Sequence, residues 1–271
     1  MSIITLLTDF GLEDEYVGIM KGVILSINPS AAIVDITHQV SPQDIIDAAY
    51  RIKSYYKYFP EKTLHLVVVD PGVGSCRPVL AAKIDGHYFL APDNGILTPL
   101  LDNGYIDNLV FVENADYFLD SVSQTFHGRD IFAPVAAHIS KGIEIMKLGR
   151  PASIKSPVRL SLKKPFITDK NELSGTIISI DRFGNLITNI DCEILKKIKP
   201  RTCESGKNEK IKLIIGDRTV TGLSKSYNSV APKTPLAIIG SRGYLEIAVN
   251  CGSAKDFFHA SRYDIIKITK R

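Results

Sequence analysis

Tryptophan is absent from this chain, and only three methionines and four cysteines occur among its 271 residues. The cysteines, at positions 76, 192, 203 and 251, include no Cys-x-x-Cys pair, so the sequence suggests neither a zinc knuckle nor a disulfide framework. No apolar run approaches the roughly 18 residues of a membrane-spanning helix, and the N-terminus lacks the basic segment of a secretory signal. We therefore expect a cytoplasmic protein with no membrane partner.

Charge of one sign does not dominate either, because the formal net charge is only +4. Residues 1–150 carry 11 lysines and arginines against 18 acidic residues, whereas residues 151–271 carry 22 against 11. A basic half favours a polyanion partner, but an acidic half in the same chain also allows the two surfaces to meet each other. The compact basic cluster Lys196-Lys197-Ile198-Lys199 with Arg201 is more typical of a solvated surface. We expect no nucleic-acid partner.

The first 150 residues alternate apolar runs with amphipathic segments, which is typical of a parallel sheet with helices on both faces. The expected strands are Ile3–Thr8, Ala32–Thr37, Leu64–Val69, Val79–Ile84 and Tyr88–Ala91, and the expected helices are Glu15–Asn28, Pro42–Phe59 and about Arg129–Lys141. Ser41 is the expected N-cap of the second helix, with Pro42 in its first turn. Asp85-Gly86 predicts a hairpin turn. Residues 1–150 are therefore predicted to form a Rossmann-like α/β domain.

The composition changes after residue 150. Residues 151–170 contain three prolines and scattered charges without a clear period, which predicts an extended linker. Short β-rich runs follow at close spacing: Gly175–Ile180, Asn185–Ile190, Ile211–Gly216, Leu236–Ile239, Tyr244–Val249 and Ile265–Thr269. This spacing indicates a small antiparallel barrel or sandwich, and we predict a β-barrel domain over residues 171–271.

Polar residues follow three strands of the expected first domain, at the edge where α/β sheets bind ligands. Thr8-Asp9-Phe10-Gly11 follows the first strand, Thr37-His38 the second, and a glycine-rich turn from Asp70 to Arg77 the third. The glycines of that turn resemble half of a dinucleotide fingerprint, but Arg77 occupies the place of the third glycine. The turn therefore disfavours a bound dinucleotide cofactor.

Three further polar clusters have an ordinary structural interpretation beside a functional one. His127, next to Gly128, precedes the last helix of the first half, where it is a candidate site residue or merely a capping or space-filling side chain. The segments 181–185 and 240–244 combine aromatic, amide and charged groups around glycines, and their chemistry alone favours two simple hairpin turns.

Together, these segments and others resemble one family along nearly the whole chain. The matching elements are LTDFG near the start, VVVDPGVGSCR, APDNGILTP at 91–99, TFHGRDIFAPVAAH at 125–138, DRFGNLITNI at 181–190 and GSRGYLEIAVN at 240–250. The chain is similar in these segments to the S-adenosylmethionine (SAM) hydroxide adenosyltransferases, relatives of fluorinase and chlorinase. The resemblance implies that the protein is an enzyme in which water or hydroxide displaces L-methionine from the ribose 5′ carbon of SAM by SN2 attack, giving adenosine.

The resemblance also implies a homotrimer and a set of substrate-binding residues. The nucleoside would lie between the first domain of one subunit and the second domain of the next. Asp9 corresponds to the carboxylate that binds the ribose hydroxyls. Further positions correspond to binding of the methionine part, namely Asp181, Phe183, Asn185, Ser241 and Arg242. Asn250 lies in the segment that reads the adenine edge, and Tyr227 is a candidate for stacking on the base.

In the hydroxide branch of the family an Asp, an Arg and a His surround the nucleophile, and Asp70, Arg77 and His127 stand at those positions. The resemblance implies that the halogenases have a Tyr at the position of Asp70 and a Tyr-Ser pair at the positions of His127 and Gly128. Gly128 lacks the serine hydroxyl that a bound halide would need, so water is the better-supported nucleophile here. Arg77 would favour hydroxide character, and either Asp70 or His127 would accept the proton.

We expect no metal and no cofactor, since the Asp and His residues lack a recognised metal-ligand spacing and SAM is the substrate. Two alternatives to the hydrolase remain at this stage. One is a halide-using adenosyltransferase, which Asp70, His127 and Gly128 disfavour. The other is a non-catalytic SAM or nucleoside sensor, which gives no reason to keep Asp70, Arg77 and His127 together.

Overall fold

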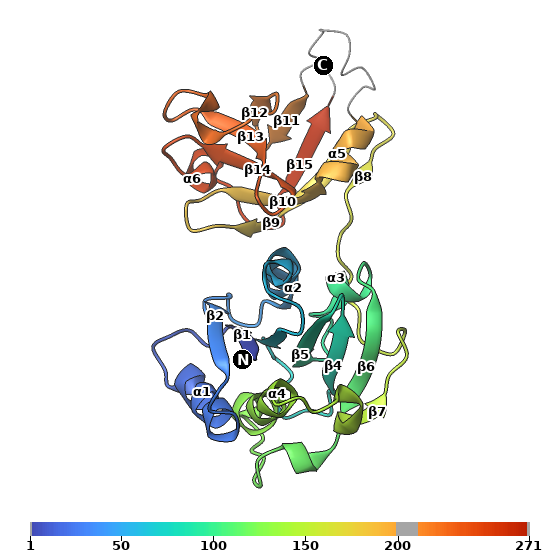
Figure 1. Cartoon of the computed structure of the whole chain (residues 1–271). Coiled ribbons are helices and arrows are strands. Elements are labelled where there is room, and N and C mark those ends of the chain that lie inside the picture. Colours follow the sequence, from blue (N-terminus) through green and yellow to red (C-terminus); the bar gives the residue numbers. More distant parts are fainter. Residues whose placement is uncertain (1, 199–210, 270–271) are drawn as a thin grey trace. The chain divides into compact units, whose positions relative to one another are not determined.

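The computed structural model describes residues 2–198 and 211–269. Contacts between Cα atoms divide the chain into two compact units, unit 1 from Met1 to Ser161 and unit 2 from Leu162 to Arg271 (Figure 1). Segment 151–170, expected as a linker, contains the boundary between the units and also the short strand β8 (Phe166–Ile167). Lys199 and Arg201 of the basic cluster lie outside the described residues.

Unit 1 is built on a seven-stranded sheet in the order β2-β1-β3-β5-β4-β6-β7. Its strands are β1 (Ile3–Thr8), β2 (Ala32–Thr37), β3 (Leu64–Val68), β4 (Val79–Ile84), β5 (His87–Pro92), β6 (Ile106–Val112) and β7 (Gly149–Pro151). Strands β2, β1, β3 and β5 run parallel, whereas β4, β6 and β7 pair antiparallel. The Rossmann-like α/β architecture is confirmed, with a mixed sheet instead of a purely parallel one.

The hairpin between β4 and β5 explains why the sheet is mixed. Asp85 and Gly86 both adopt left-handed backbone conformations, with φ of 49° and 78°, as a tight two-residue turn requires. The chain therefore turns straight back and pairs antiparallel, where a helical crossover would have given another parallel strand.

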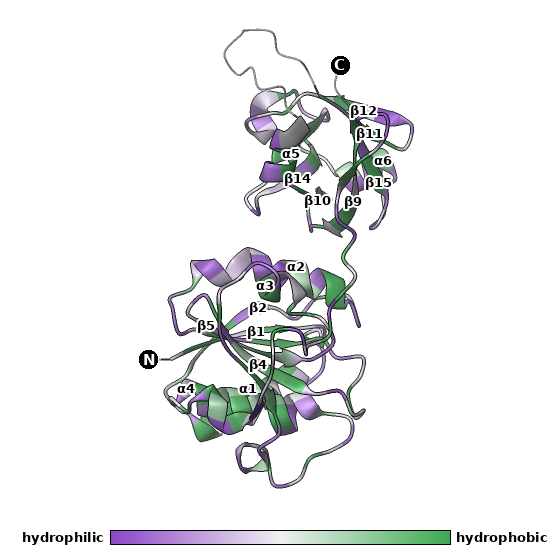
Figure 2. Ribbon diagram, turned by 90° about the vertical axis from the view of Figure 1, so that its right-hand side faces the viewer, coloured by the Kyte–Doolittle hydropathy of each residue, from purple (hydrophilic) through white to green (hydrophobic). Residues whose placement is uncertain are grey.

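Helices cover both faces of this sheet, as expected. Figure 2 shows α2 (Ile45–Tyr55) and α3 (Thr98–Leu101) on one face, and α1 (Tyr16–Ile27) and α4 (Ala133–Ser140) on the other. Each pair encloses its own apolar layer, one including Ile52 of α2 and the other Met20 of α1. The central strands β1, β3, β5 and β4 are thus buried on both sides, which holds the loops at their ends in fixed positions.

One expected helix start is wrong, and one expected helix has a different form in its first part. Helix α2 begins at Ile45 and not at Pro42, because Gln43 has a left-handed φ of 66° and Asp44 caps the helix by accepting a hydrogen bond from the Asp47 amide. The helix expected over about Arg129–Lys141 is present, but it consists of a π-helical turn over Gly128–Phe132 followed by α4.

The proline in the first turn of α4 gives a physical reason for the second difference. Pro134 has no N–H to donate to the Asp130 carbonyl. That carbonyl instead accepts a hydrogen bond of 2.9 Å from the Leu119 amide. The loop preceding His127 is thereby tied to the start of the helix.

Unit 2 is an antiparallel sheet in the order β12-β11-β15-β9-β10-β14-β13, with β8 paired to β9. Its strands are β9 (Leu173–Ile180), β10 (Leu186–Asp191), β11 (Lys212–Ile215), β12 (Arg218–Thr221), β13 (Pro235–Ile239), β14 (Tyr244–Val249) and β15 (Ile265–Thr269), with the helices α5 (Cys192–Ile198) and α6 (Ala254–Phe258). The end strands β12 and β13 contact each other, so the sheet nearly closes around one apolar core. The predicted antiparallel β-barrel is confirmed.

Within the described part of the chain, no helix combines the length and the apolar character needed to cross a bilayer.

Candidate functional site

Asp70, Arg77 and His127 form one hydrogen-bonded group at the carboxyl edge of the unit 1 sheet. Arg77 donates to the Asp70 carboxylate twice, from Nε to Oδ1 at 2.8 Å and from Nη2 to Oδ2. The same Nη2 lies 3.1 Å from Nδ1 of His127. The glycine-rich turn after β3 thus supplies two of these side chains, and the loop before the π-helical turn supplies the third.

The protonation of His127 follows from this geometry. A guanidinium nitrogen can only donate, so Nδ1 of His127 is the acceptor and the proton of the neutral imidazole resides on Nε2. Burial lowers the pKa of His127, and the neighbouring Arg77 cation lowers it further. His127 is therefore neutral at pH 7, which allows it to lie beside a guanidinium without charge repulsion.

Burial also fixes the guanidinium of Arg77. The side chains of Arg77 and Asp70 are 10% and 5% exposed, and the guanidinium lies over the Phe132 ring at 5.4 Å. A buried, bidentate ion pair is held in a single geometry, unlike a surface pair. The unit 1 group is accordingly preorganised.

A cavity of about 200 Å³ opens beside this group. It is lined by Phe10, Tyr16, Val68, Asp70, Val73, Thr125, Phe126, His127 and Gly128. A Cβ atom on Gly128 would lie 3.1 Å from the Phe126 ring and 3.2 Å from the Met20 sulfur. A serine at this position would therefore require its neighbours to shift.

Asp9 lies at the same edge of the sheet, directly after β1, but it is not among the residues that line this cavity. Its Oδ2 accepts a hydrogen bond of 2.7 Å from the Gln43 amide. The carboxylate is thereby fixed, and its Oδ1 accepts no hydrogen bond from any described residue.

The candidate residues of unit 2 are brought together around a second cavity, of about 590 Å³. Its lining includes every one of them: Asp181, Phe183, Asn185, Tyr227, Ser241, Arg242 and Asn250. They come from the β9–β10 turn, the β13–β14 turn, the end of β14 and a short 3-10 turn. The two segments that looked like plain hairpins thus face one hollow.

The β9–β10 turn is held by the carboxylate of Asp181. Oδ1 accepts from the backbone amides of Phe183 and Asn185, and Oδ2 accepts from Nδ2 of Asn185, each at 2.9 Å. The Phe183 ring, 77% exposed, is left free to cover a ligand.

The side-chain amide of Asn250 uses one N–H within the protein, because Nδ2 donates to the Val230 carbonyl at 2.8 Å. Tyr227 is anchored through its hydroxyl, which donates to Oε1 of Glu246 at 2.6 Å.

Glu246 lines the same cavity and was missed in the sequence. The available signal was its position in β14, where Tyr244–Val249 is buried throughout and Glu246 is the one charged residue. A charge in such a strand requires a specific partner or a ligand.

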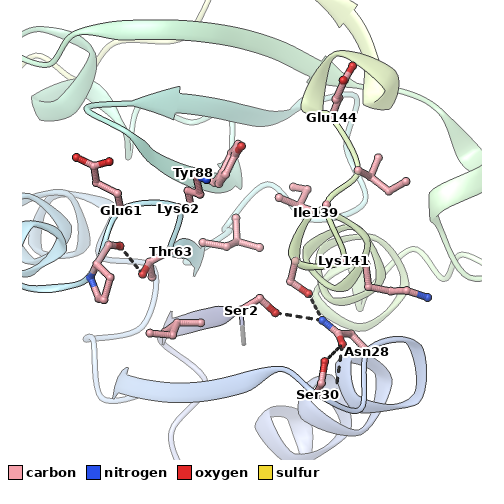
Figure 3. A pocket seen from close by; sticks show the side chains of 16 residues that line it. Ser2, Asn28, Ser30, Glu61, Lys62, Thr63, Tyr88, Ile139, Lys141 and Glu144 are labelled. Atoms are coloured by element: carbon pink, nitrogen blue, oxygen red, sulfur yellow. Dashed lines mark hydrogen bonds between the residues drawn. The ribbon is translucent and has the colours of Figure 1, made fainter.

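A third hollow lies at the opposite, amino ends of β1 and β3 and contains none of the candidate residues (Figure 3). Asn28, at one side of this hollow, donates to the hydroxyls of Ser2 and Ser140 at 3.2 and 2.8 Å. These bonds join the ends of α1 and α4 to the chain start, which is a structural role.

No three His, Cys, Asp or Glu side chains converge as a metal-binding group anywhere in residues 2–198 and 211–269.

Comparison with known proteins gives full-length matches. The family model for the SAM hydroxide adenosyltransferase N-terminal domain matches residues 4–149, and that for the C-terminal domain matches residues 175–267. The chain is 34% identical to (R)-S-adenosyl-L-methionine hydrolase of Thermus thermophilus, covering 92% of both chains. It is 32% identical to the enzyme of that name from Methanocaldococcus jannaschii, covering 99% of this chain and 96% of the relative.

Fluorinases are also relatives: that of Actinoplanes sp. is 30% identical over 92% of this chain and 91% of its own. Among solved structures, an uncharacterised conserved protein from Thermotoga maritima superposes with a TM-score of 0.89 at 36% identity, covering 98% of this chain and 99% of the other. Both units and their order are therefore shared with these relatives, and the chain belongs to the SAM hydroxide adenosyltransferase family.

Proposed function

We propose that this protein hydrolyses SAM to adenosine and L-methionine. The observation that carries the proposal is the buried group in which Arg77 holds Asp70 by two hydrogen bonds and reaches His127 by a third contact. This group matches the family's hydroxide branch, and relatives over nearly the full length are named (R)-S-adenosyl-L-methionine hydrolases.

The chemistry requires positioning more than acid catalysis. A water oxygen forms a bond to the ribose C5′ while the C5′–S bond breaks, and the sulfur keeps the electron pair as a neutral thioether. Because a sulfonium leaves without protonation, the protein has only to hold one water in line and accept its proton. Orientation of this kind can lower the barrier by several kcal/mol. Arg77 stabilises the developing hydroxide, and Asp70 or His127 takes the proton.

Substrate binding is assigned to the remaining residues. Asp9 binds the ribose hydroxyls, and the methionine part binds to Asp181, Phe183, Asn185, Ser241 and Arg242. An amino-acid zwitterion suits this set, because a guanidinium binds the carboxylate and an aspartate binds the ammonium. Asn250 and Tyr227 contact the adenine, Tyr227 by stacking. The reaction needs no added cofactor or metal.

We further propose that the protein is a cytoplasmic homotrimer. The support is the charge distribution, −7 over residues 1–150 and +11 over residues 151–271, together with the family resemblance. Opposite charges on the two halves favour contact between the first half of one copy and the second half of the next.

The second candidate is a halide-using adenosyltransferase, which the fluorinase relatives bring into view. Gly128 argues against it, because no hydroxyl is present there to donate to a halide and its neighbours leave little room for one. Chromatography after incubation with SAM decides between the two. Adenosine and methionine in equal amounts, with or without added fluoride or chloride, support the hydrolase, whereas a 5′-halogenated nucleoside or no turnover overturns it.

A further inference from the structure

Glu246 is a nearly buried carboxyl group in the wall of the unit 2 cavity. It is only 8% exposed and lies among the buried residues of β14. Burial raises its pKa, and the negative charge of nearby Asp181 raises it as well, while Tyr227 and Arg242 act in the opposite direction. A carboxylate at this position is therefore costly unless partners or a ligand compensate its charge.

The two oxygens of Glu246 have different surroundings. Oε1 accepts the hydrogen bond from Tyr227, whereas Oε2 receives no hydrogen bond from any described residue. A Cβ on residue 240 would lie only 2.5 Å from Oε2, so the carboxylate occupies space that the missing side chain of Gly240 leaves open. One oxygen thus anchors an aromatic ring of the cavity, and the other is left for a ligand.

The charges around the cavity indicate which ligands the Glu246 carboxylate favours. The charged side chains among the lining residues are Asp181 and Glu246, both negative, and Arg242, positive. With Glu246 ionised, the lining carries one net negative charge. SAM carries one net positive charge, because its sulfonium adds to a neutral zwitterion, whereas methionine, adenosine and the thioether S-adenosylhomocysteine are uncharged overall.

We propose that Glu246 selects for charge: its carboxylate favours the sulfonium substrate over the uncharged products and thioether. This inference rests on the proposed function and deepens it. Before reaction the cavity charge and the ligand charge are opposite; after the C5′–S bond breaks, the attraction is gone. Glu246 thereby assists both the choice of substrate and the release of methionine.

The test compares the affinities of SAM and S-adenosylhomocysteine by calorimetry, with Arg77→Ala as the background so that substrate is not consumed during titration. Glu246→Gln keeps an oxygen that can accept from Tyr227 and removes the charge. In this variant we expect SAM to bind roughly ten- to fifty-fold more weakly, because one partly screened attraction between opposite charges is lost. The affinity for S-adenosylhomocysteine should stay within about twofold of that of the parent protein. Glu193→Gln, a similar change on α5 at an exposed carboxylate that pairs with Lys196, should leave both affinities unchanged.

Two further variants keep the test decisive. Glu246→Asp retains the charge and should retain the preference for SAM even if packing suffers. Tyr227→Phe keeps the ring and removes its hydrogen bond to Glu246. Any loss of affinity in this variant should therefore be equal for SAM and S-adenosylhomocysteine. Equal weakening of both ligands in Glu246→Gln, or no change in either, overturns the inference. Failure of the Arg77-intact chain to release adenosine instead overturns the proposed function, and that result is independent of the ratio of affinities.

Discussion

Arg77 is the residue through which the other two members of the unit 1 group are connected. Asp70 fixes its guanidinium through Nε and Nη2, and His127 lies within hydrogen-bond distance of the same Nη2. Removing Arg77 would leave the Asp70 carboxylate buried without its cation, and removing His127 would leave a guanidinium donor unused. The three side chains are therefore expected to behave as one unit.

This gives a prediction on non-additivity. Arg77→Ala and His127→Ala should each slow turnover by roughly 10²- to 10⁴-fold, because each would disrupt the proposed water-holding geometry. The double variant should lie within about tenfold of the worse single variant. Steady-state kcat measurements on the four proteins check this, and multiplied losses in the double variant would show that the residues act separately.

The protonation state of His127 gives a second prediction. Its pKa lies below the ordinary value of 6.5, through burial first and Arg77 second. If neutral His127 is the proton acceptor, kcat/KM stays constant down to pH 6.5 and falls only as the pH drops through that lowered pKa. A pH–rate profile measures the acid limb, and the residual activity of His127→Gln should lack it. An acid limb that persists in that variant would show that protonation of His127 is not what stops the reaction.

At the scale of elements, the approach of two loops assembles the unit 1 group. Gly74 lies in the turn that carries Asp70 and Arg77, and a Cβ there would be 2.2 Å from the Gln124 carbonyl oxygen of the His127 loop. Gly74 also has a left-handed φ of 78°. Only glycine allows this contact, because backbone atoms on the far side cannot rotate away.

We therefore expect Gly74→Ala to lower kcat at least tenfold, on the order of the loss from a 1 Å displacement of catalytic groups. Gly142→Ala is the matched control. Gly142 has a φ of 97° but no atom within 4 Å of a Cβ, so the substitution carries backbone strain alone. The prediction is confirmed if the two variants have comparable denaturation midpoints and kcat is lower in Gly74→Ala than in Gly142→Ala. Equal kcat in the two variants would mean that the loop contact does not position the group.

Strands were the elements most readily predicted from the sequence. Ile3–Thr8, Ala32–Thr37 and Val79–Ile84 agree with β1, β2 and β4 to the residue, because strands of this sheet form short, mainly apolar runs bounded by turn residues. Helix starts were harder. The beginning of α2 depends on the left-handed Gln43, and a non-glycine residue in that conformation carries no reliable sequence signal.

Part of the candidate site was predictable from the sequence, because many of its residues lie on turns. Motif segments point to residues such as Asp181 and Arg242 on turns, where polar groups stand out against neighbouring apolar strands. Glu246 was missed because it sits in the middle of a strand, and its role depends on Tyr227, 19 positions away in the chain, and on the absence of a side chain at Gly240. Such tertiary contacts are not encoded in local patterning.

At the scale of the whole molecule, the opposite charges of the two halves predict assembly. Light scattering at low salt should give the mass of three chains of 29.9 kDa each. Raising the salt concentration should weaken the assembly without abolishing it, because exposed ion pairs contribute little each and are screened. A monomer at low salt and micromolar concentration would contradict both the trimer and the role assigned to the charge distribution.

Reaction in water enriched in ¹⁸O tests most directly whether solvent supplies the 5′ oxygen of adenosine. If it does, mass spectrometry will find the label in the 5′ hydroxyl of adenosine and none in methionine. Adenosine without the label, or no adenosine at all, would overturn the proposed hydrolysis.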